Sequence, residues 1–395
     1  MGYSKTIALL AGAAMGLTMS AQAQTLDHAR AYNAEALADA GGRTSTLASM
    51  NATGPEFSGQ IQFRYYLNIR DDAALVNEMT NGFQTRRSKL EAKGEIADGW
   101  SYFFQVAASF DGGGLSLQEA WVKYDISEDS NLTWGQFKAP GLREELVSSK
   151  RQLAAERSVV NETFTQDRSQ GVQYAWDSEN TRFRVAFTDG LDSENTDFTG
   201  ESSDFSFSGR FEYKGAGDWK QFDDFTSFRT SAFAWMIGGA AHWESGGDTN
   251  GTVDGDLFQL TVDGSVEGDG WNAFAAFVYR MIDITGGTDA DDMGFLVQGG
   301  YFLDPAWELF GRVDMVIPDS NYPALTGEDF TTVTVGVNHY VIPDSHAAKF
   351  TADVVYFIDA LSESSAVVSA DSGSGLLASG EDGQFALRFQ FQLLF

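Results

Sequence analysis

The chain has 395 residues with 26 basic and 56 acidic side chains, and its formal net charge of -30 excludes nucleic acid as a partner. It has no cysteine, so ordinary packing and hydrogen bonds must hold it together. Its 42 glycines, 6 prolines and 13% aromatic residues favour strands and tight turns over helices.

Residues 1–23 have the features of a secretory signal peptide. Lys5 precedes an apolar run from Thr6 to Thr18, and Ala21-Gln22-Ala23 fits the small-x-small cleavage pattern. The run is too short to span a membrane, although an N-terminal anchor helix is the alternative interpretation. We therefore predict that the mature chain begins at Gln24 and leaves the cytoplasm.

Residues 24–56 form the only helix-like segment of any length. A weak apolar stripe runs through it, and the segment fits a short periplasmic helix or a disordered extension equally well. No run of 18 apolar residues follows it, so the sequence excludes helical membrane spans.

From residue 57 to 395 the apolar residues alternate with polar ones, as they do in strands. In "FSGQIQFRYYLNI" one face carries Ile61, Phe63 and Tyr65, and the other carries Gln60, Gln62 and Arg64. Similar segments recur to the terminal "RFQFQLLF". Counting them predicts an all-β, up-and-down antiparallel transmembrane barrel of about 16 strands, uncertain by two.

Turns and aromatic residues favour this barrel over a soluble sandwich. Very short turns, such as Asp98-Gly99, alternate with long polar loops, as in barrels with periplasmic turns and external loops. A sandwich of about 340 residues without a linker would be hard to build. The aromatic residues at strand ends suit interfacial girdles: Trp100, Tyr124, Trp134, Trp176, Trp243, Trp271 and Trp307.

Residues 83–176 carry motifs of a known family. "WGQFKAP" is followed by "REELVSS" at 143–149 and "AERS" at 155–158, after the Arg86-Arg87 pair and before Gly171-Val172. In this order they resemble the phosphate-selective porins of the O and P type. The resemblance implies a 16-stranded outer-membrane barrel, usually a homotrimer, in contact with lipid and lipopolysaccharide. It also implies that the loop after the fifth strand, here Ala139 to Asp167, folds inward as a constriction. The terminal Phe395 resembles the signal that the outer-membrane assembly machinery reads.

Basic residues concentrate in the same part of the chain. Between residues 84 and 184 lie 13 of the 26 basic residues. A charge on the lipid face at bilayer depth would cost ~2–4 kcal/mol, so the strand cations must face the lumen. Arginine offers a planar fork and lysine a mobile charge for phosphate-like oxygens. We predict an anion pathway along these residues: Arg87, Lys89, Lys93, Lys123, Lys138, Arg143, Lys150, Arg151, Arg157, Arg182 and Arg184.

Other functions stay open at this stage. Acids such as Glu91 and Glu119 lie among the bases, so a general or cation-preferring porin is an alternative. Lumen aromatics (Tyr66, Phe103, Trp121) would suit a sugar channel, and an adhesive or structural barrel would not conduct at all. Neither HExxH nor GxSxG occurs, so we expect a channel and not an enzyme, with no cofactor and no metal.

Overall fold

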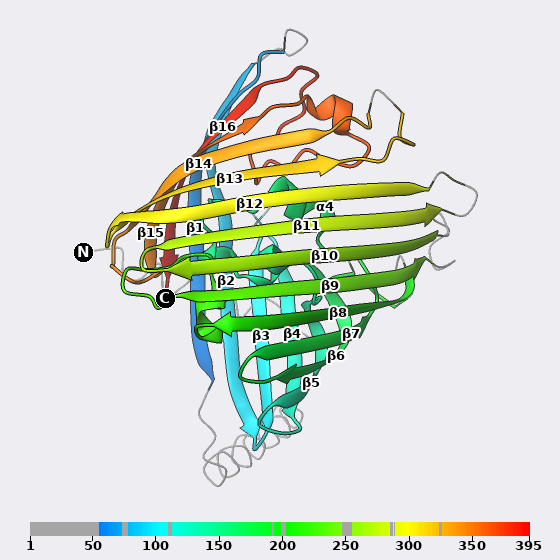
Figure 1. Ribbon diagram of the computed structural model, residues 1–395, viewed down its shortest axis with the longest axis vertical. Coiled ribbons are helices and arrows are strands. Elements are labelled where there is room, and N and C mark those ends of the chain that lie inside the picture. Colours follow the sequence, from blue (N-terminus) through cyan, green and yellow to red (C-terminus); the bar gives the residue numbers. More distant parts are fainter. Residues whose placement is uncertain are drawn as a thin grey trace, which may run out of the picture. The chain divides into compact units, whose positions relative to one another are not determined.

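A computed structural model describes residues 55–72, 78–109, 113–191, 193–198, 203–246, 255–284, 287, 289–323 and 326–395 (Figure 1). The predicted signal peptide, most of the extension that follows it, and the loop acids Asp248 and Asp254 lie outside the described residues. Among the helices described, none is long and apolar enough to cross a membrane.

The strands pair in sequence order, each antiparallel to the next, and the last pairs with the first to close a barrel. This confirms the predicted fold and the predicted strand number. The strands are β1 Glu56–Ile69, β2 Met79–Ala97, β3 Trp100–Ala108, β4 Leu115–Asp125, β5 Ser130–Lys138, β6 Arg168–Asp177, β7 Thr181–Thr188, β8 Ser203–Ala216, β9 Ala234–Gly246, β10 Gly255–Gly268, β11 Trp271–Ile284, β12 Ala290–Asp304, β13 Trp307–Ile317, β14 Phe330–Tyr340, β15 Ala348–Phe357 and β16 Gln384–Leu394.

The alternation of side chains gives the barrel an apolar outside and a polar inside. On β1, Ile61 and Phe63 are 38% and 43% exposed, whereas Gln62 and Arg64 are fully buried. Since an outer-membrane barrel meets lipid on its outer face, the exposed apolar side chains are the ones that lipid covers. The predicted girdle tryptophans are all exposed in the same way.

The C-terminal strand closes the barrel. β16 pairs with β1 from Gln60 opposite Leu394 to Ile69 opposite Phe385. Beyond it, the backbone N–H of Gly59 donates to the carbonyl of Phe395 at 2.7 Å, and the N–H of Phe395 donates back at 3.1 Å. The Phe395 ring lies where a side chain at residue 59 would stand, so a larger residue there would displace the ring.

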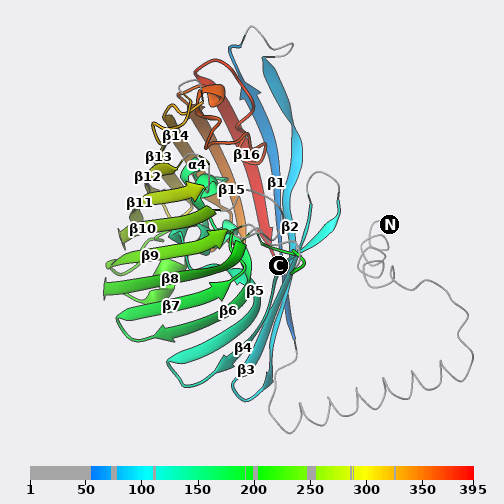
Figure 2. The ribbon, with the colours of Figure 1, turned by 90° about the vertical axis from the view of Figure 1, so that its right-hand side faces the viewer.

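Three connecting segments lie inside the barrel and fill the lumen along β8–β16. One is the predicted loop between β5 and β6, which lies within the ring of strands in both views (Figures 1 and 2). The other two are residues 217–233, with the 3-10 helix η2 Trp219–Asp223, and residues 358–383, with η4 Leu361–Ser364. Their buried Phe222, Phe225 and Val368 join clusters with strand side chains. Sequence analysis predicted only the first. The five aromatic residues between 217 and 233, among them Phe222 and Phe225, were the available signal for the second.

Candidate pore and constriction

The loop between β5 and β6 contains the short helices α3 Arg143–Leu146, η1 Ser149–Arg151 and α4 Val159–Phe164. It packs as a small hydrophobic core against the far wall. Val160 and Phe164 are 1% exposed and belong to one cluster with Val278, Val316 and Phe330 of β11, β13 and β14. Burying such side chains stabilises by ~1.5–3 kcal/mol each, so this packing fixes the loop across the lumen.

Glu156 of this loop is held by three arginines of β1 and β2. Its carboxylate lies 2.9 Å from Arg64 Nη1 and 2.8 Å from Arg86 Nε, and it also pairs with Arg87. Strict alternation would place Arg86 and Arg87 on opposite faces. A β-bulge between Gln62 and Phe63 of β1, where β2 has the extra residue Arg86, lets both reach Glu156.

Polar side chains of the opposite wall bond the backbone of the same loop. Asp353 accepts from the N–H of Ala155 at 2.9 Å, and Asp314 accepts from the N–H of Val159 at 2.9 Å. Several wall side chains donate to loop carbonyls: Arg312 to Glu156, Lys349 to Gln152, Asn338 to Leu153, Gln259 to Phe164 and Arg280 to Thr163. These wall residues position the loop, so the open part of the lumen lies along β2–β7.

Two cavities occupy that open part. The larger has a volume of about 770 Å³ and the smaller about 300 Å³. Nine basic and three acidic side chains line the larger, and five basic and three acidic ones line the smaller. A chain with 56 acids and 26 bases therefore presents an excess of positive charge along its open lumen.

Three side chains line both cavities: Lys89, Arg157 and Arg168. They lie where the two cavities adjoin, and we call these three side chains the constriction. Arg157 Nε lies 3.2 Å from Glu145, and Arg168 lies 2.7 Å from Asp167 and 3.5 Å from Glu119. Burial opposes ionisation of Glu145, but Arg157, Lys138 and Arg168 lower its pKa to about 2, so it stays charged.

Lys89 differs from its two neighbours. It is only 8% exposed, and no hydrogen bond or ion pair joins it to any of the residues that the structure describes. The charges nearest to it are cations, namely Arg168, Arg87, Lys138 and Arg157. In its charged form Lys89 favours an entering anion over a cation, because the anion supplies the counter-charge that is missing among the described residues.

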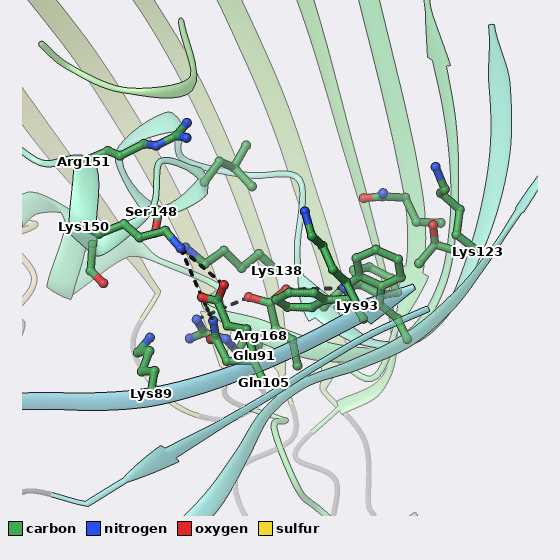
Figure 3. Close-up of a pocket in the computed structure, with 18 of the residues that line it drawn as sticks. Lys89, Glu91, Lys93, Gln105, Lys123, Lys138, Ser148, Lys150, Arg151 and Arg168 are labelled. Atoms are coloured by element: carbon green, nitrogen blue, oxygen red, sulfur yellow. Dashed lines mark hydrogen bonds and ion pairs between the residues drawn. The ribbon is translucent and has the colours of Figure 1, made fainter. Parts of the chain in front are cut away.

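The predicted pathway residues separate into two groups. Eight line the larger cavity: Lys89, Lys93, Lys123, Lys138, Lys150, Arg151, Arg157 and Arg184. Figure 3 shows most of them around one space, with Lys150 reaching Glu91. Arg87 lines the smaller cavity.

Arg143 and Arg182 are not among the residues that line these two cavities. Arg143 is the first residue of α3 in the loop; it is buried and donates to the carbonyl of Phe222 at 2.7 Å. Arg182 stacks on the Trp219 ring at 4.3 Å. Both contact the inward segment 217–233, which sequence analysis did not predict.

Arg86 and Arg168 line the cavities but were absent from the predicted pathway. Arg86 was missed because the bulge that turns it inward leaves no sign in the sequence. Arg168 directly follows the predicted constriction loop and pairs with Lys138 across the strands, so its position could have been inferred from that loop.

Glu91 is the main acid in the larger cavity. It lies 3.3 Å from Lys150 of the constriction loop and accepts from Ser58 at 3.0 Å and Gln105 at 2.8 Å. Across the neighbouring strands it stands in register with Gln105, and Gln105 with Glu119. Residues two apart on a strand lie ~6.8 Å apart, so Glu91 stands on β2 between Lys89 of the constriction and Lys93 at the far end of the cavity.

Glu162 of α4 lines the smaller cavity as an exposed carboxylate. The side chain is open to the cavity, but the protein around it excludes part of its water; this desolvation and the nearby Glu156 and Asp371 raise its pKa, while Arg157 opposes the shift. Glu145 also faces it, and so do the other charged side chains of the cavity: Arg86, Arg87, Lys89, Asp167 and Arg168.

Current through this cavity should therefore depend on pH. As the pH falls through the pKa of Glu162, one negative charge disappears beside the constriction. In water, a unit charge ~7 Å away changes the energy of a passing ion by roughly 0.6 kcal/mol. The anion-to-cation permeability ratio should therefore rise about two- to threefold. Reversal potentials at a series of pH values measure this. The dependence should vanish in Glu162→Gln and persist in Glu179→Gln, whose side chain lies in an exposed turn.

Among the residues that the structure describes, no group of three or more His, Asp or Glu side chains is arranged to hold a metal ion.

Of the predicted lumen aromatics, Phe103 and Trp121 line the larger cavity. Tyr66 instead donates to the carbonyl of Gly373 at 2.8 Å and packs against the inward segment 358–383.

These features together define a class of protein. A closed barrel with an apolar outer face, a lumen narrowed by an inward loop and charged cavities on both sides of the narrowing is an outer-membrane porin. The family profile described as "phosphate-selective porin O and P" matches residues 60–356, well over half of the chain. The chain therefore belongs to the phosphate-selective porin O and P family, as its motifs predicted.

Solved structures share the same fold at low identity. An anion-selective porin from Comamonas acidovorans superposes with a TM-score of 0.61 at 11% identity, over 87% of this chain and 99% of that one. OprB from Pseudomonas putida gives 0.60 at 10% identity, over 90% and 97%. The trimer form of OmpT from Vibrio cholerae gives 0.53 at 14% identity, over 86% and 99%. No curated protein sequence matches the chain.

Proposed function

We propose that this porin favours small anions, phosphate among them, and that the anions pass through the constriction of Lys89, Arg157 and Arg168. The observation that carries this is the buried Lys89, which has no counter-charge among the described residues and lies between two cavities with more basic than acidic lining. Several cations on both sides, each partly balanced by an acid, would let an anion enter and leave again.

The acids of the chain are the argument for the rival, a cation-preferring porin. Those acids belong mostly to other parts of the chain, whereas the constriction consists of three bases. Because external charges are screened beyond ~8–10 Å at moderate salt, the constriction should dominate selectivity. An anion-selective porin with the same fold makes this charge pattern plausible in such a barrel.

Reversal potentials test the proposal. The purified protein, inserted into planar bilayers under a potassium chloride gradient, should prefer chloride over potassium. Added phosphate should reduce the chloride current in a concentration-dependent way. The preference should weaken at high salt, where the Debye length falls to ~3 Å at 1 M. A preference for potassium would refute the proposal, and no current at all would favour an adhesive or structural barrel.

The setting of the protein follows from the same expectations. We infer export through the signal peptide 1–23, an extension at 24–56 before the barrel at 57–395, and a homotrimer in contact with lipid and lipopolysaccharide. The Phe395 end would be the signal for the outer-membrane assembly machinery. The trimer form of one protein with this fold supports the homotrimer. The charged cavities suit the diffusion of small solutes, so we propose a channel and not an enzyme.

A further inference from the structure

The end of the larger cavity far from the constriction has an aromatic wall. Phe103 of β3 and Trp121 of β4 are direct partners in the strand register, and their rings stack with centroids 5.4 Å apart at 29°. Both line the cavity and both are half-buried, so part of each ring faces the open space. Trp121 Nε1 lies 3.5 Å from Glu119 Oε2, which helps to fix the indole in this orientation.

Aromatic rings on this face need an explanation. A lumen-facing strand position usually carries a polar side chain, and the lipid face is where barrels place their aromatic residues. Phe104, the neighbour of Phe103 on β3, obeys this rule and is 44% exposed on the outer face. Phe103 and Trp121 instead present an apolar surface to water without being enclosed in one of the buried clusters.

Ammonium groups flank the two rings. Lys93 of β2 stands opposite Phe103 in the register, and Lys123 follows Trp121 by two residues on the same face of β4. Lys93 lies 3.0 Å from Glu56 and Lys123 lies 3.1 Å from Asp125. Because the Lys93 and Glu56 side chains are 61% and 67% exposed, this pairing is weak and leaves the ammonium available to a solute.

We propose that this end of the cavity selects organic anions with a flat ring, of the class of aromatic carboxylates, over small anions without a ring. The inference rests on the proposed anion preference. The ring of the solute stacks on Phe103 and Trp121, and its carboxylate pairs with Lys93 or Lys123. Stacking of this kind favours the ring-bearing solute about three- to tenfold, which is weak enough for release.

Block of the chloride current by benzoate tests this. The protein is first characterised in planar bilayers by its reversal potential in potassium chloride, and then benzoate, acetate or cyclohexanecarboxylate is added. We expect benzoate to halve the current at a concentration about three- to tenfold below that needed for acetate. Cyclohexanecarboxylate, which has a ring that is not flat, should fall near acetate.

Two variants and one control locate the effect. Trp121→Leu and Phe103→Leu should bring the benzoate value toward the acetate value, with chloride preference unchanged. Phe104→Leu, a change of the same size on the outer face, should behave as the wild type. A heat-modifiable band on gels confirms that each variant is folded.

The outcomes separate this inference from the proposed function. Equal block by benzoate and acetate, with chloride preference intact, overturns the aromatic site alone. Equal block by benzoate and cyclohexanecarboxylate also overturns it, because plain apolar contact would then suffice. A preference for potassium before any organic anion is added overturns the proposed function instead.

Discussion

Replacing Glu156 by glutamine will destabilise the barrel and loosen its constriction loop. Glu156 is 1% exposed and is the shared partner of Arg64, Arg86 and Arg87. Removing its charge leaves these guanidinium groups together without their common counter-charge. Breaking one buried ion pair typically costs about 3–5 kcal/mol, and we expect a loss in free energy of unfolding of that order. Urea unfolding in detergent, followed by gel shift or tryptophan fluorescence, measures it.

The single-channel current should change as well. Without Glu156 the loop keeps its bonds to Asp353 and Arg312, so it should fluctuate and not leave the lumen. Open-channel noise should therefore increase. The matched control is Glu179→Gln, in an exposed turn, which should alter neither stability nor noise. Wild-type stability in Glu156→Gln would mean that the three arginines do not depend on this carboxylate.

The pH dependence of stability should reflect the titration of Glu156. Burial opposes ionisation of Glu156, but Arg86, Arg87 and Arg64 hold its pKa well below the usual range. A carboxyl with a depressed pKa in the folded state stabilises fully above its unfolded pKa of ~4.3. The stabilisation is lost as the pH falls from there through the folded-state pKa. Wild-type protein should therefore lose stability in acid more steeply than Glu156→Gln does.

Replacing Lys89 by glutamine will reduce the preference for anions more than any other single loss of a lysine along the cavities. Lys89 belongs to the constriction and has no acid to neutralise it among the described residues. At an effective dielectric constant of ~20, the interaction energy between a unit charge and an ion at 4 Å is about 4 kcal/mol. Water in the lumen screens the larger part of this energy. We expect a fall of about tenfold in the anion-to-cation permeability ratio, equal to ~1.4 kcal/mol. Lys89→Glu should bring the ratio near one or below it.

A matched lysine and a stability measurement test the reason for this effect. Lys93→Gln removes the same charge from the same strand face, but outside the constriction, where water screens the largely exposed ammonium group. It should change the ratio little. Because four cations surround Lys89, its removal should leave the stability unchanged or raise it. A smaller effect from Lys89→Gln than from Lys93→Gln would place the selective passage elsewhere.

Several features could be predicted because they depend on local patterns. Alternation from Gln60 to Ile69 fixes which side chains face the lumen. A shift by one residue would make Arg64 point toward the lipid, which is costly. The same reasoning placed Lys89, Lys93 and Lys123 in the lumen. The motifs from residue 83 to 176 identified the family, and the inward loop followed from that resemblance, because the motifs lie within it and on both sides of it.

What the sequence alone determined is therefore the barrel, its inner and outer faces, and the concentration of bases near the pore. Only the tertiary structure decided which bases remain free to meet a solute. Arg86 turns inward because of a bulge, and Arg143 and Arg182 are taken up by the unpredicted inward segment 217–233. Glu156 takes three arginines that are 69 to 92 residues away in the chain. The physical reason is that alternation fixes the face of a side chain, whereas its counter-charge comes from whichever distant segment packs against it.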